Sequence, residues 1–513
     1  MGCFHSAYSE DTEKARNNGM NLIPDKSPAT GSYWCTGDTQ WNVLKERLPA
    51  GSPIPTRDAM NEEFLFSPEG VLNSFEGMRG DLIVVLDDGW DVPYGATDSR
   101  LFGSLAADPE RFPSLHGTPA ERLRQLSDRV RALGYRGLGL WVPAQLPTLV
   151  DGKELSLTMD EERAGWEERA RWCHEAGVMY WKVDWGRGAA DGNYRRMMTE
   201  CVRKYAPALK IEHALVRQPL FEPEKPEQEM HAWREKYLRE VLPVSDYLRT
   251  YDVAPEFRYA STLHRAAFCL RAAAEVSGEC AVLNVEDTAL IGAALGCSLG
   301  VMRHPREERM QKLTYDYRPL SETLCALRWQ RMAPPFAANR GKTLISEETL
   351  RDEWHYPVRD ASLWPCVSDV TEGYSAPAGI ARNLPLPEVR AEGERPFVAA
   401  SVHPETGALC VAAIPRTLPG ALERTPSAEI RVREAQIDAP VGLFGRFARM
   451  TVEFDRPVEG RRVWAQSLAG DAAEDVTGEV ELRGNTLSIA GATAARVAGA
   501  AENELPAIVL KLI

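Results

Sequence analysis

The chain has 513 residues, and its 60 Lys and Arg against 74 Asp and Glu give a formal net charge of −14. This length predicts two to four domains, or one large barrel with an appended domain. An acidic chain without a basic patch is not expected to bind nucleic acid. The 13 Trp, 15 Tyr and 14 Phe exclude global disorder, because they need burial or a ligand. No run of about 18 apolar residues is present, so no membrane span is predicted.

The N-terminal sequence lacks the basic and then apolar pattern of a secretion signal. Ten cysteines are scattered along the chain without a Cys-x-x-Cys pair. This distribution is typical of reduced, mostly buried thiols rather than of a disulfide framework. We therefore expect a soluble cytoplasmic protein.

Strand-like and helix-like segments alternate from about residue 28 to residue 335. One strand candidate, Asp81 to Asp87, is a continuous apolar run, which is typical of a parallel strand buried on both faces. The helix after it begins with a capping box, in which Thr118 precedes Pro119 and Glu121. The eight predicted strands are Gly31–Thr39, Asp81–Asp87, Gly137–Val142, Val178–Trp185, Leu209–Leu215, Asp246–Val253, Cys280–Val285 and Cys297–Met302.

Eight strands with helices between them predict a closed (β/α)8 TIM barrel, over residues 28–335. A doubly wound open sheet is the alternative, but no Gly-rich phosphate-binding turn follows the first strand. Residues 1–27 are expected to form an N-terminal extension, and residues 336–394 a connector packed on the barrel. Short β segments separated by turn residues predict a C-terminal antiparallel β-sandwich over residues 395–513.

In such a barrel the functional residues gather at the C-terminal ends of the strands. The second strand ends in Asp87-Asp88-Gly89-Trp90. Two adjacent carboxylates repel each other unless cations or hydroxyl donors approach them, and they accept hydrogen bonds from sugar hydroxyls well. A helix cap or a loop turn is the alternative interpretation of this motif.

The fourth strand contains Lys182 and Asp184 at alternate positions, so both face the barrel axis together with Tyr180. The same alternation predicts that Trp185 faces outward, under the helices. Lys182 should lower the pKa of Asp184 and keep this carboxyl ionised, as a covalent glycosidase nucleophile requires. A structural ion pair inside the barrel is the alternative.

Two further strands end in ionisable residues. Asp252 follows Arg249 on the sixth strand, and the charge of Asp184 would raise its pKa, which gives the unequal pair that acid–base catalysis needs. A surface loop Asp with an Arg partner is the alternative. The fifth strand carries Glu212 and His213, and an isolated histidine is more often a hydrogen-bonded core residue than a base. No His pair has the spacing of zinc ligands, so no zinc site is expected.

Four motifs follow one another at plausible spacing: Asp87-Asp88-Gly89-Trp90, Asp108-Pro109-Glu110-Arg111-Phe112-Pro113, Leu133-Gly134-Tyr135-Arg136-Gly137-Leu138-Gly139-Leu140-Trp141 and Lys182-Val183-Asp184. Together they resemble the α-galactosidase clan, glycoside hydrolase families 27 and 36 (clan D). The resemblance covers about residues 28–305, and the layout is closer to the compact family 27. It implies a retaining double displacement without a cofactor, with Asp184 as the nucleophile and Asp252 as the acid/base.

The resemblance also implies a set of substrate-binding residues. Asp87 and Asp88 match the pair that holds the O4 and O6 hydroxyls of an α-galactoside, with Lys182 nearby. Glu212 corresponds to the acidic residue that helps to bind O2 of the sugar. Arg249 corresponds to the arginine beside the acid/base, and Trp141 to an apolar wall for the sugar.

The expected activity is that of an exo-acting α-galactosidase on a small oligosaccharide or glycoconjugate. Asp252 follows Arg249 by three residues rather than the usual four, and Glu212 is followed by His213 where the family often has Trp. An α-N-acetylgalactosaminide or a β-L-arabinopyranoside is therefore an alternative substrate, and transglycosylation an alternative outcome. Two other classes stay open: a catalytically silent sugar-binding protein, and a Mg-dependent enolase-type barrel using Asp184, Glu212 and Asp252. A homo-oligomer is possible.

Overall fold

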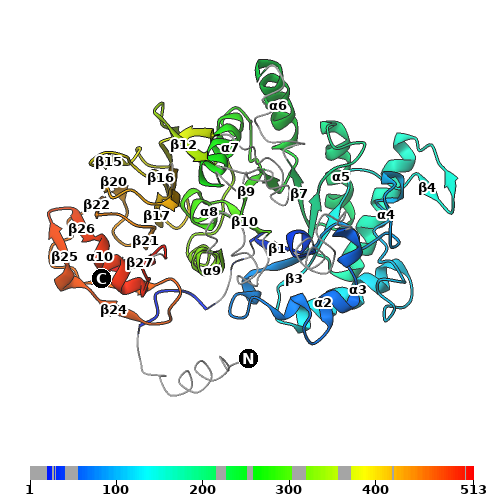
Figure 1. Ribbon diagram of the computed structural model, residues 1–513, viewed down its shortest axis with the longest axis horizontal. Helices are drawn as coiled ribbons and strands as arrows, with labels where there is room; N and C mark the ends of the chain where they lie inside the picture. The colour runs from blue at the N-terminus through cyan, green and yellow to red at the C-terminus, as the bar shows by residue number, and fades with distance from the viewer. Residues whose placement is uncertain are drawn as a thin grey trace.

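A computed structural model describes most of the chain, and the N-terminal 19 residues lie outside it. The described residues are 20–25, 28, 30–40, 56–214, 227–250, 258–302, 319–355, 371–418, 421–502 and 504–513. They form a barrel and a β-rich C-terminal region that lie side by side (Figure 1). No described helix is long and apolar enough to cross a membrane.

Eight parallel strands close into a barrel, which confirms the predicted (β/α)8 fold. Neighbours around the barrel follow the chain order, and the first strand pairs with the last. The strands are β1 (Tyr33–Cys35), β2 (Ile83–Leu86), β3 (Gly137–Val142), β6 (Tyr180–Val183), β7 (Lys210–Ala214), β8 (Tyr247–Arg249), β9 (Val282–Glu286) and β10 (Ser298–Val301). Each coincides with one of the predicted strands, and β9 extends one residue further than expected.

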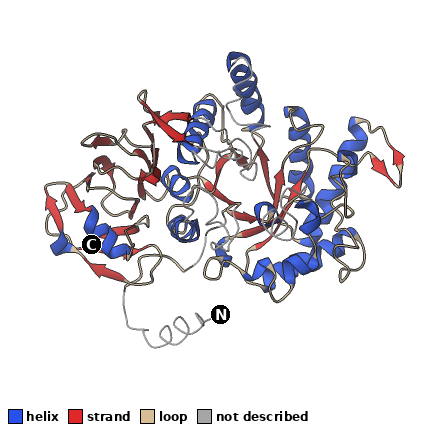
Figure 2. Cartoon of the chain, viewed as in Figure 1, coloured by secondary structure: helices blue, strands red, loops and turns tan. Residues whose placement is uncertain are grey.

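Helices surround these strands (Figure 2). The helices that follow β2 to β10 are α3 (Pro119–Ala132), α4 (Met159–Ala176), α5 (Gly192–Tyr205), α6 (Glu227–Val241), α7 (Arg258–Ala273), α8 (Ala289–Leu295) and α9 (Pro319–Gln330). The predicted capping box is present at the start of α3, where Thr118 and Glu121 bond each other's backbone N–H groups. Among the described residues between β1 and β2, the helices are short, and α2 (Glu62–Phe66) is one of them.

The barrel interior divides into an apolar layer and a charged layer. Tyr33, Ile83, Val85, Tyr180 and Tyr247 pack together from four strands and fill the apolar layer. The outward-facing residues of the same strands join a separate, larger core beneath the helices. Polar inward positions follow the apolar layer toward the C-terminal ends of the strands, which we call the mouth of the barrel.

The C-terminal region contains two large sheets, an eight-stranded one in the order β11-β14-β16-β17-β21-β27-β23-β24 and a five-stranded one in the order β15-β20-β22-β26-β25. Most strand pairs are antiparallel, as expected for this sandwich, but β14–β16, β17–β21 and β20–β22 are parallel. Three strands of these two sheets, β11, β14 and β15, lie within the segment expected to be a connector, so the sheets include residues before 395.

The bounds of the remaining elements are as follows. In the C-terminal region they are β11 (Thr343–Ile345), β12 (Thr349–His355), β13 (Thr371–Pro377), β14 (Gly379–Arg382), β15 (Glu388–Arg390), β16 (Phe397–Val402), β17 (Leu409–Ile414), β18 (Arg416–Leu418), β19 (Ala421–Arg424), β20 (Glu429–Ala435), β21 (Val441–Phe444), β22 (Arg449–Phe454), β23 (Val463–Ser467), β24 (Ala473–Asp475), β25 (Val480–Arg483), β26 (Thr486–Ala490), α10 (Gly491–Ala498) and β27 (Ala507–Leu512). Pairs β12–β13 and β18–β19 form small hairpins there, and β4 (Leu149–Val150) and β5 (Lys153–Glu154) form another beside the barrel.

One hydrophobic cluster extends from the barrel helices into the eight-stranded sheet, while a second cluster lies within the C-terminal sheets themselves. Helix α8 packs against β16 and β17, and Phe397 of β16 belongs to the same apolar cluster as the barrel helices. Buried polar contacts also cross the boundary: Arg258 of α7 pairs with Glu423 at 2.7 Å, and Arg382 of β14 donates to the carbonyl oxygen of Leu295 at 2.6 Å. The sheets therefore cover one side of the barrel directly.

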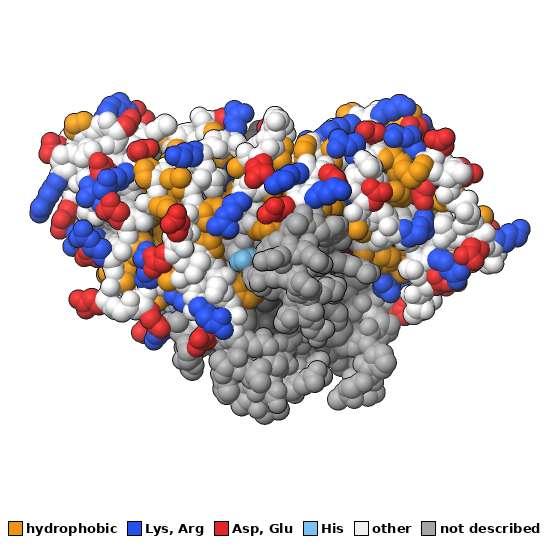
Figure 3. Space-filling view, turned by 90° about the horizontal axis from the view of Figure 1, so that it is seen from above, with side chains coloured by type: hydrophobic (Ala, Val, Ile, Leu, Met, Phe, Trp, Pro, Cys, Tyr) orange, Lys and Arg blue, Asp and Glu red, His pale blue; other side chains and the backbone are white. Residues whose placement is uncertain are grey.

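On the face drawn in Figure 3, the described surface mixes basic and acidic side chains without an extended basic area. This distribution agrees with the acidic composition of the whole chain.

Candidate active site

Asp184 directly follows β6 and lies at the mouth of the barrel. The Arg249 guanidinium contacts its Oδ1 at 2.9 Å, and the Trp141 indole N–H donates to its Oδ2 at 3.0 Å. Burial alone would raise the pKa of Asp184, but the charges of Arg249 and Lys182 and the Trp141 hydrogen bond outweigh it and lower the pKa to about 2. The carboxylate is therefore ionised at neutral pH and oriented through both of its oxygens.

Lys182 lies at the inward position before Asp184, but its direct ion pair is with Asp87 on β2. The distance from Nζ to Oδ2 of Asp87 is 2.9 Å, and the Cys35 thiol donates to the same oxygen at 2.7 Å. Burial opposes ionisation of Asp87, yet the Lys182 charge and these hydrogen bonds lower its pKa. Lys182 thus contributes to the lowered pKa of Asp184 as predicted, while its closest carboxylate is Asp87.

Asp88 has a different environment from its neighbour. Its Oδ2 accepts a hydrogen bond from Arg57 Nε at 2.8 Å, whereas its Oδ1 is buried and has no hydrogen-bond partner among the described residues. Burial raises the pKa of Asp88 to about 7, against the opposing charge of Arg57 and with the help of the charge on Asp87. Asp88 is therefore a titratable acceptor with one unused oxygen.

Glu212 lies on β7, deeper in the barrel, and its side chain is fully buried. The hydroxyl groups of Tyr33 and Tyr180 donate to its two oxygens at 3.1 Å and 2.9 Å, and Arg249 Nε lies 3.9 Å from Oε1. Burial raises the pKa of Glu212, and Arg249 and the two hydroxyls act in the opposite direction. Arg249 also contacts Glu286 at 3.3 Å, so this one guanidinium connects three carboxylates.

Trp141 forms one side of an aromatic cluster at the mouth. Its ring centroid lies 5.3 Å from that of Trp185 and 6.5 Å from that of Phe102. The prediction that Trp185 faces outward is wrong, because β6 ends at Val183 and the strand alternation does not extend to residue 185. Trp141 itself is 1% exposed, and its polar contact with the site is the hydrogen bond that it donates to Asp184.

His213 lies on the outer side of β7, one position beyond Glu212. Its ring nitrogens contact Arg195 at 3.0 Å and Thr199 at 2.9 Å, both on α5. Burial and then the Arg195 charge lower the pKa of His213 well below its ordinary value. His213 is therefore a neutral, hydrogen-bonded core residue, as the sequence indicated.

Asp252, the expected acid/base, lies outside the described residues, and its role and its separation from Asp184 stay predictions.

Three residues of the site were not identified from the sequence: Arg57, Cys35 and Tyr33. Strand alternation places Tyr33 and Cys35 on the inner face of β1 and could have identified them. Arg57 follows no periodic pattern, so no signal in the sequence indicated its contact with Asp88.

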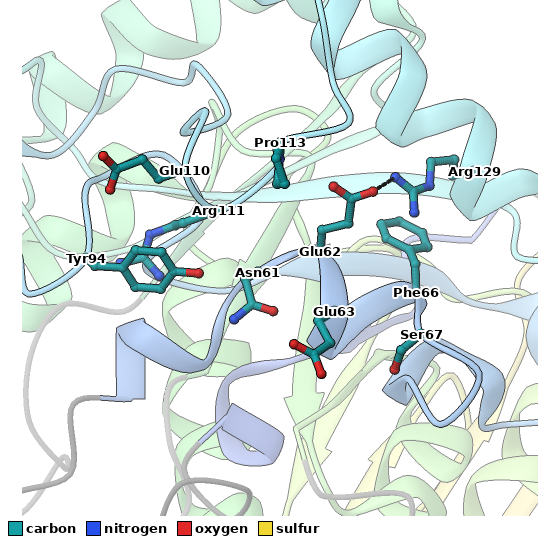
Figure 4. Close-up of a pocket in the computed structure, with 10 residues that line it drawn as sticks. All are labelled: Asn61, Glu62, Glu63, Phe66, Ser67, Tyr94, Glu110, Arg111, Pro113 and Arg129. Carbon is teal, nitrogen blue, oxygen red and sulfur yellow. Dashed lines mark hydrogen bonds and ion pairs between the residues drawn. The ribbon is translucent and has the colours of Figure 1, made fainter.

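A cleft of about 440 Å³ lies between α2 and the loop that carries the motif from Asp108 to Pro113 (Figure 4). None of the predicted site residues lines it. The ring of Tyr94 lies 4.2 Å from the Arg111 guanidinium at one end, and Glu62 pairs with Arg129 at the other. The lining residues are Asn61, Glu62, Glu63, Phe66, Ser67, Tyr94, Glu110, Arg111, Pro113 and Arg129.

The fold and the site define a (β/α)8-barrel protein whose mouth carries buried carboxylates held by Lys and Arg. No family model matches the sequence, and no curated protein matches it. Similar solved structures include a GH27 β-L-arabinopyranosidase from Geobacillus stearothermophilus, at 10% identity over 84% of this chain and 87% of that chain, with a TM-score of 0.39. An α-amylase from Geobacillus thermoleovorans complexed with acarbose has 10% identity over 94% and 99%, with a TM-score of 0.44.

A glucosidase from Croceicoccus marinus has 12% identity over 97% of this chain and 98% of that chain, with a TM-score of 0.37. At these identities and TM-scores the similarities assign neither a family nor a substrate to this chain. The fold class rests on the strand pairing of the chain itself.

Proposed function

We propose that the chain is a retaining glycoside hydrolase, and specifically an exo-acting α-galactosidase that releases terminal α-galactose. The observation that carries this proposal is the Asp184 carboxylate, ionised and held through both oxygens at the mouth of the barrel. A covalent glycosidase needs such a carboxylate, because the nucleophile must be unprotonated and correctly oriented before the sugar arrives. The order of motifs that resembles the α-galactosidase clan supports the choice of substrate.

In the proposed mechanism Asp184 attacks the anomeric carbon from the face opposite the leaving group. Asp252 protonates the leaving oxygen and then activates the water that releases the sugar with its anomeric configuration retained. Arg249 and Trp141 keep the carboxylate of Asp184 in position during both steps. Retention predicts a separation of about 5–5.5 Å between the two carboxyl groups, against about 6.5–9.5 Å for inversion.

The polar groups beside Asp184 are suited to binding sugar hydroxyls. Asp87 and Lys182 supply an acceptor and a donor in one ion pair, and Asp88 supplies an acceptor with one unused oxygen. The family resemblance assigns Asp87 and Asp88 to O4 and O6 of galactose. The same groups would serve an α-N-acetylgalactosaminide or a β-L-arabinopyranoside, so these remain alternative substrates, and transglycosylation remains an alternative outcome.

The enolase-type alternative requires a divalent cation between carboxylates on neighbouring strands. Arg249 already contacts both Asp184, at 2.9 Å, and Glu212, at 3.9 Å. A guanidinium at this position repels a second cation, and the two oxygens of Glu212 already accept tyrosine hydroxyls. This arrangement favours the glycosidase over the metal-dependent reaction.

The test is a panel of nitrophenyl α- and β-glycosides that includes the galactoside, the N-acetylgalactosaminide and the β-L-arabinopyranoside. We expect hydrolysis of the α-galactoside that Asp184→Asn lowers by at least about a thousandfold, as loss of a nucleophile does. Asp98→Asn is the matched control, because Asp98 lies on the surface in an ion pair with Arg100. Turnover should be unchanged by a chelator.

Azide added to Asp184→Ala should restore cleavage of an activated α-galactoside and give the β-galactosyl azide, because azide enters from the face that the nucleophile occupied. Hydrolysis of only another pyranoside would keep the mechanism and contradict the substrate. Sugar binding without turnover, unchanged in Asp184→Asn, would instead support the sugar-binding protein. Loss of turnover with the chelator would support the metal-dependent reaction.

A further inference from the structure

The Arg57 side chain lies at the mouth between Asp88 and the aromatic cluster. Its Nε donates to Asp88 at 2.8 Å, and its guanidinium carbon lies 4.7 Å from the ring centroid of Phe102 and 5.9 Å from that of Trp185. The side chain is 32% exposed, and its two terminal amino groups have no partner among the described residues. The guanidinium is therefore fixed by an ion pair and by stacking while it keeps free hydrogen-bond donors.

The backbone around Arg57 is held in place by a buried arginine. Arg111, which is 1% exposed, donates to the carbonyl oxygen of Arg57 at 2.8 Å and to Asp58 at 3.0 Å. Figure 4 shows Arg111 in the wall of the neighbouring cleft. Gly89, with a φ of +114°, also approaches closely, since a Cβ there would lie 2.6 Å from the same carbonyl oxygen. These contacts fix Arg57 against the turn that carries Asp88.

Asp88, the ion-pair partner of Arg57, has one carboxylate oxygen that no described residue uses. Its Oδ1 is buried without a hydrogen-bond partner among the described residues. A buried acceptor of this kind destabilises the fold unless a donor reaches it, so native proteins rarely keep one without a function. An acceptor in Asp88 and free donors in Arg57 are thus presented together, on a support that is already rigid.

We propose that Arg57 is a specificity-determining residue that binds one hydroxyl group of the sugar jointly with Asp88. The hydroxyl donates to Oδ1 of Asp88 and accepts from a terminal amino group of Arg57. A hydroxyl can do both at once, whereas an ammonium only donates and a carboxylate only accepts. This inference rests on the proposed function, because it takes the mouth of the barrel as the site of the sugar.

Among the described residues, the charges at the mouth favour a neutral sugar over an acidic one. The side chains described there include more carboxylates than cations, so a sugar carboxylate would meet net repulsion. The carboxylates are those of Asp87, Asp88, Asp184, Glu212 and Glu286, and the cations are those of Arg57, Lys182 and Arg249. The inferred ligand group is therefore an uncharged hydroxyl of a neutral pyranoside.

The experiment measures kcat/KM for an aryl α-galactoside and for its 2-, 3-, 4- and 6-deoxy analogues. It compares the wild type with Arg57→Ala, Arg57→Lys and Asp88→Asn. On the parent substrate we expect Arg57→Ala and Asp88→Asn each to lose about tenfold or more, as for a hydrogen bond to a charged group. One deoxy analogue, the same for both variants, lacks the hydroxyl that Arg57 and Asp88 bind together. On this analogue, each variant should lose less than about threefold in kcat/KM relative to wild type.

Arg57→Lys should lie between wild type and Arg57→Ala, since lysine keeps the ion pair but not the planar, stacked donor pair. Because it keeps the positive charge, it also serves if Arg57→Ala does not fold, which thermal melting would show. Arg100→Ala is the matched control, because Arg100 forms an exposed ion pair with Asp98. This variant should retain wild-type kcat/KM on every analogue.

Calorimetric binding of galactose and the free deoxy sugars separates this inference from the proposed function. If the wild type hydrolyses the galactoside and Arg57→Ala does so equally well, the inference is wrong and the glycosidase stands. Losses that persist on all deoxy analogues, or that point to different hydroxyls in the two variants, also overturn it. Sugar binding that Arg57→Ala weakens, without any turnover, contradicts the glycosidase alone. Absence of both binding and turnover contradicts both.

Discussion

Asp87 and Asp88 are adjacent in the chain, yet their pKa values shift in opposite directions. Both are buried, which raises the pKa of a carboxyl group. Asp87 is compensated by Lys182 and by the Cys35 thiol on the same oxygen, so its pKa is lowered. Asp88 has Arg57 on one oxygen only and also experiences the charge of Asp87. Local partners, rather than residue type, therefore decide which carboxylate stays ionised.

The raised pKa of Asp88 predicts a pH-dependent stability. A folded-state pKa of about 7, above the ordinary 3.8, means that the folded chain holds this proton more tightly than the unfolded chain. The resulting stabilisation is complete below the unfolded pKa and is lost as the pH rises through about 7. The melting temperature of wild type relative to Asp88→Asn should therefore fall between pH 5 and about pH 8.

Asp98→Asn provides the control for this pH series. Hydrogen bonds from Arg100 lower the pKa of the exposed Asp98 to about 2, so this carboxyl stays ionised over the whole range. The melting difference between wild type and Asp98→Asn should be constant from pH 5 to pH 9. A constant difference for Asp88→Asn as well would contradict the raised pKa.

Glu212 gives a second prediction at the residue scale. Replacing Tyr180 with Phe removes the hydroxyl that donates to Oε2 at 2.9 Å and leaves that buried oxygen without its donor. We expect a loss of about 1–3 kcal/mol in the free energy of unfolding, because the acceptor is a buried carboxylate. Tyr135→Phe is the comparison, since its hydroxyl donates to a neutral carbonyl oxygen of Ser74. Urea denaturation should show the larger loss for Tyr180→Phe.

The sequence identified the inward carboxylates but not most of their partners. Strand alternation correctly placed Lys182 and Asp184 on the barrel axis, because a residue's face depends only on its own strand. The ion pair of Lys182 with Asp87 depends on the distance across the barrel, which is set when the sheet closes. The contact between Arg57 and Asp88 depends on a loop without periodicity. Such contacts between distant segments have no local signature in the sequence.

At the scale of elements, strand β3 depends on a residue without a side chain. Gly139 faces the barrel interior, and a Cβ there would lie 2.9 Å from Val85 Cγ2 and 3.0 Å from Tyr180 Cβ. Both neighbours belong to the apolar layer of the barrel, so they have little room to move. Gly139 therefore allows the rings of this layer to pack closely.

Enlarging this position should destabilise the barrel. We expect Gly139→Ala to cost about 1–3 kcal/mol, as overpacking of a well-filled core does, and Gly139→Val to cost more. Gly80→Ala is the control, because a Cβ at Gly80 would have no neighbour within 4 Å. Thermal or urea unfolding of the three variants gives the comparison. Equal stability of Gly139→Val and wild type would show that the interior is looser than described.

The elements themselves were largely predictable, because their signals are local. The capping box at Thr118 and the αL glycine at Gly177 mark the start of α3 and the end of α4 as expected. The interpretation failed at Trp185, where the pattern of β6 was extended two residues beyond its last ladder position. Periodicity cannot show where a strand stops, since the stop depends on its neighbours.

At the scale of the whole molecule, the barrel and the C-terminal sheets are joined by buried charges as well as by apolar contacts. Arg258 at the start of α7 is 1% exposed and contacts Glu423 at 2.7 Å and Glu322 at 4.0 Å. Removing one member of a buried pair leaves the other charge without compensation. The boundary between the two regions is therefore part of the folded core.

Glu423→Gln should weaken this boundary and the whole fold together. We expect a loss of up to about 3 kcal/mol in the free energy of unfolding, with one unfolding transition in both wild type and variant. Glu394→Gln is the matched control, because Glu394 pairs with Arg424 on the surface and exposed pairs contribute about 0–1 kcal/mol. Scanning calorimetry would contradict this expectation by resolving separate transitions for the barrel and the sheets.

The overall layout was predictable in class but not in its boundaries. Alternating strands and helices predicted the closed barrel, and short β segments predicted the sandwich. Strands β11, β14 and β15 join the C-terminal sheets from a segment rich in Pro, Trp and Tyr that has no strand periodicity. Their pairing partners lie elsewhere in the chain, so the pairing could be recognised only in three dimensions.

The pairing of β1 with β10 has a consequence for biosynthesis. The Leu299 backbone N–H donates to the hydroxyl of Ser32, which lies 267 residues earlier in the chain. At a translation rate of about 5–20 residues per second, roughly 15 to 50 s pass between synthesis of the two partners. During this time the growing sheet has an unpaired edge and an uncovered tyrosine-rich interior. We expect the nascent chain to need chaperone protection until the last barrel strand leaves the ribosome.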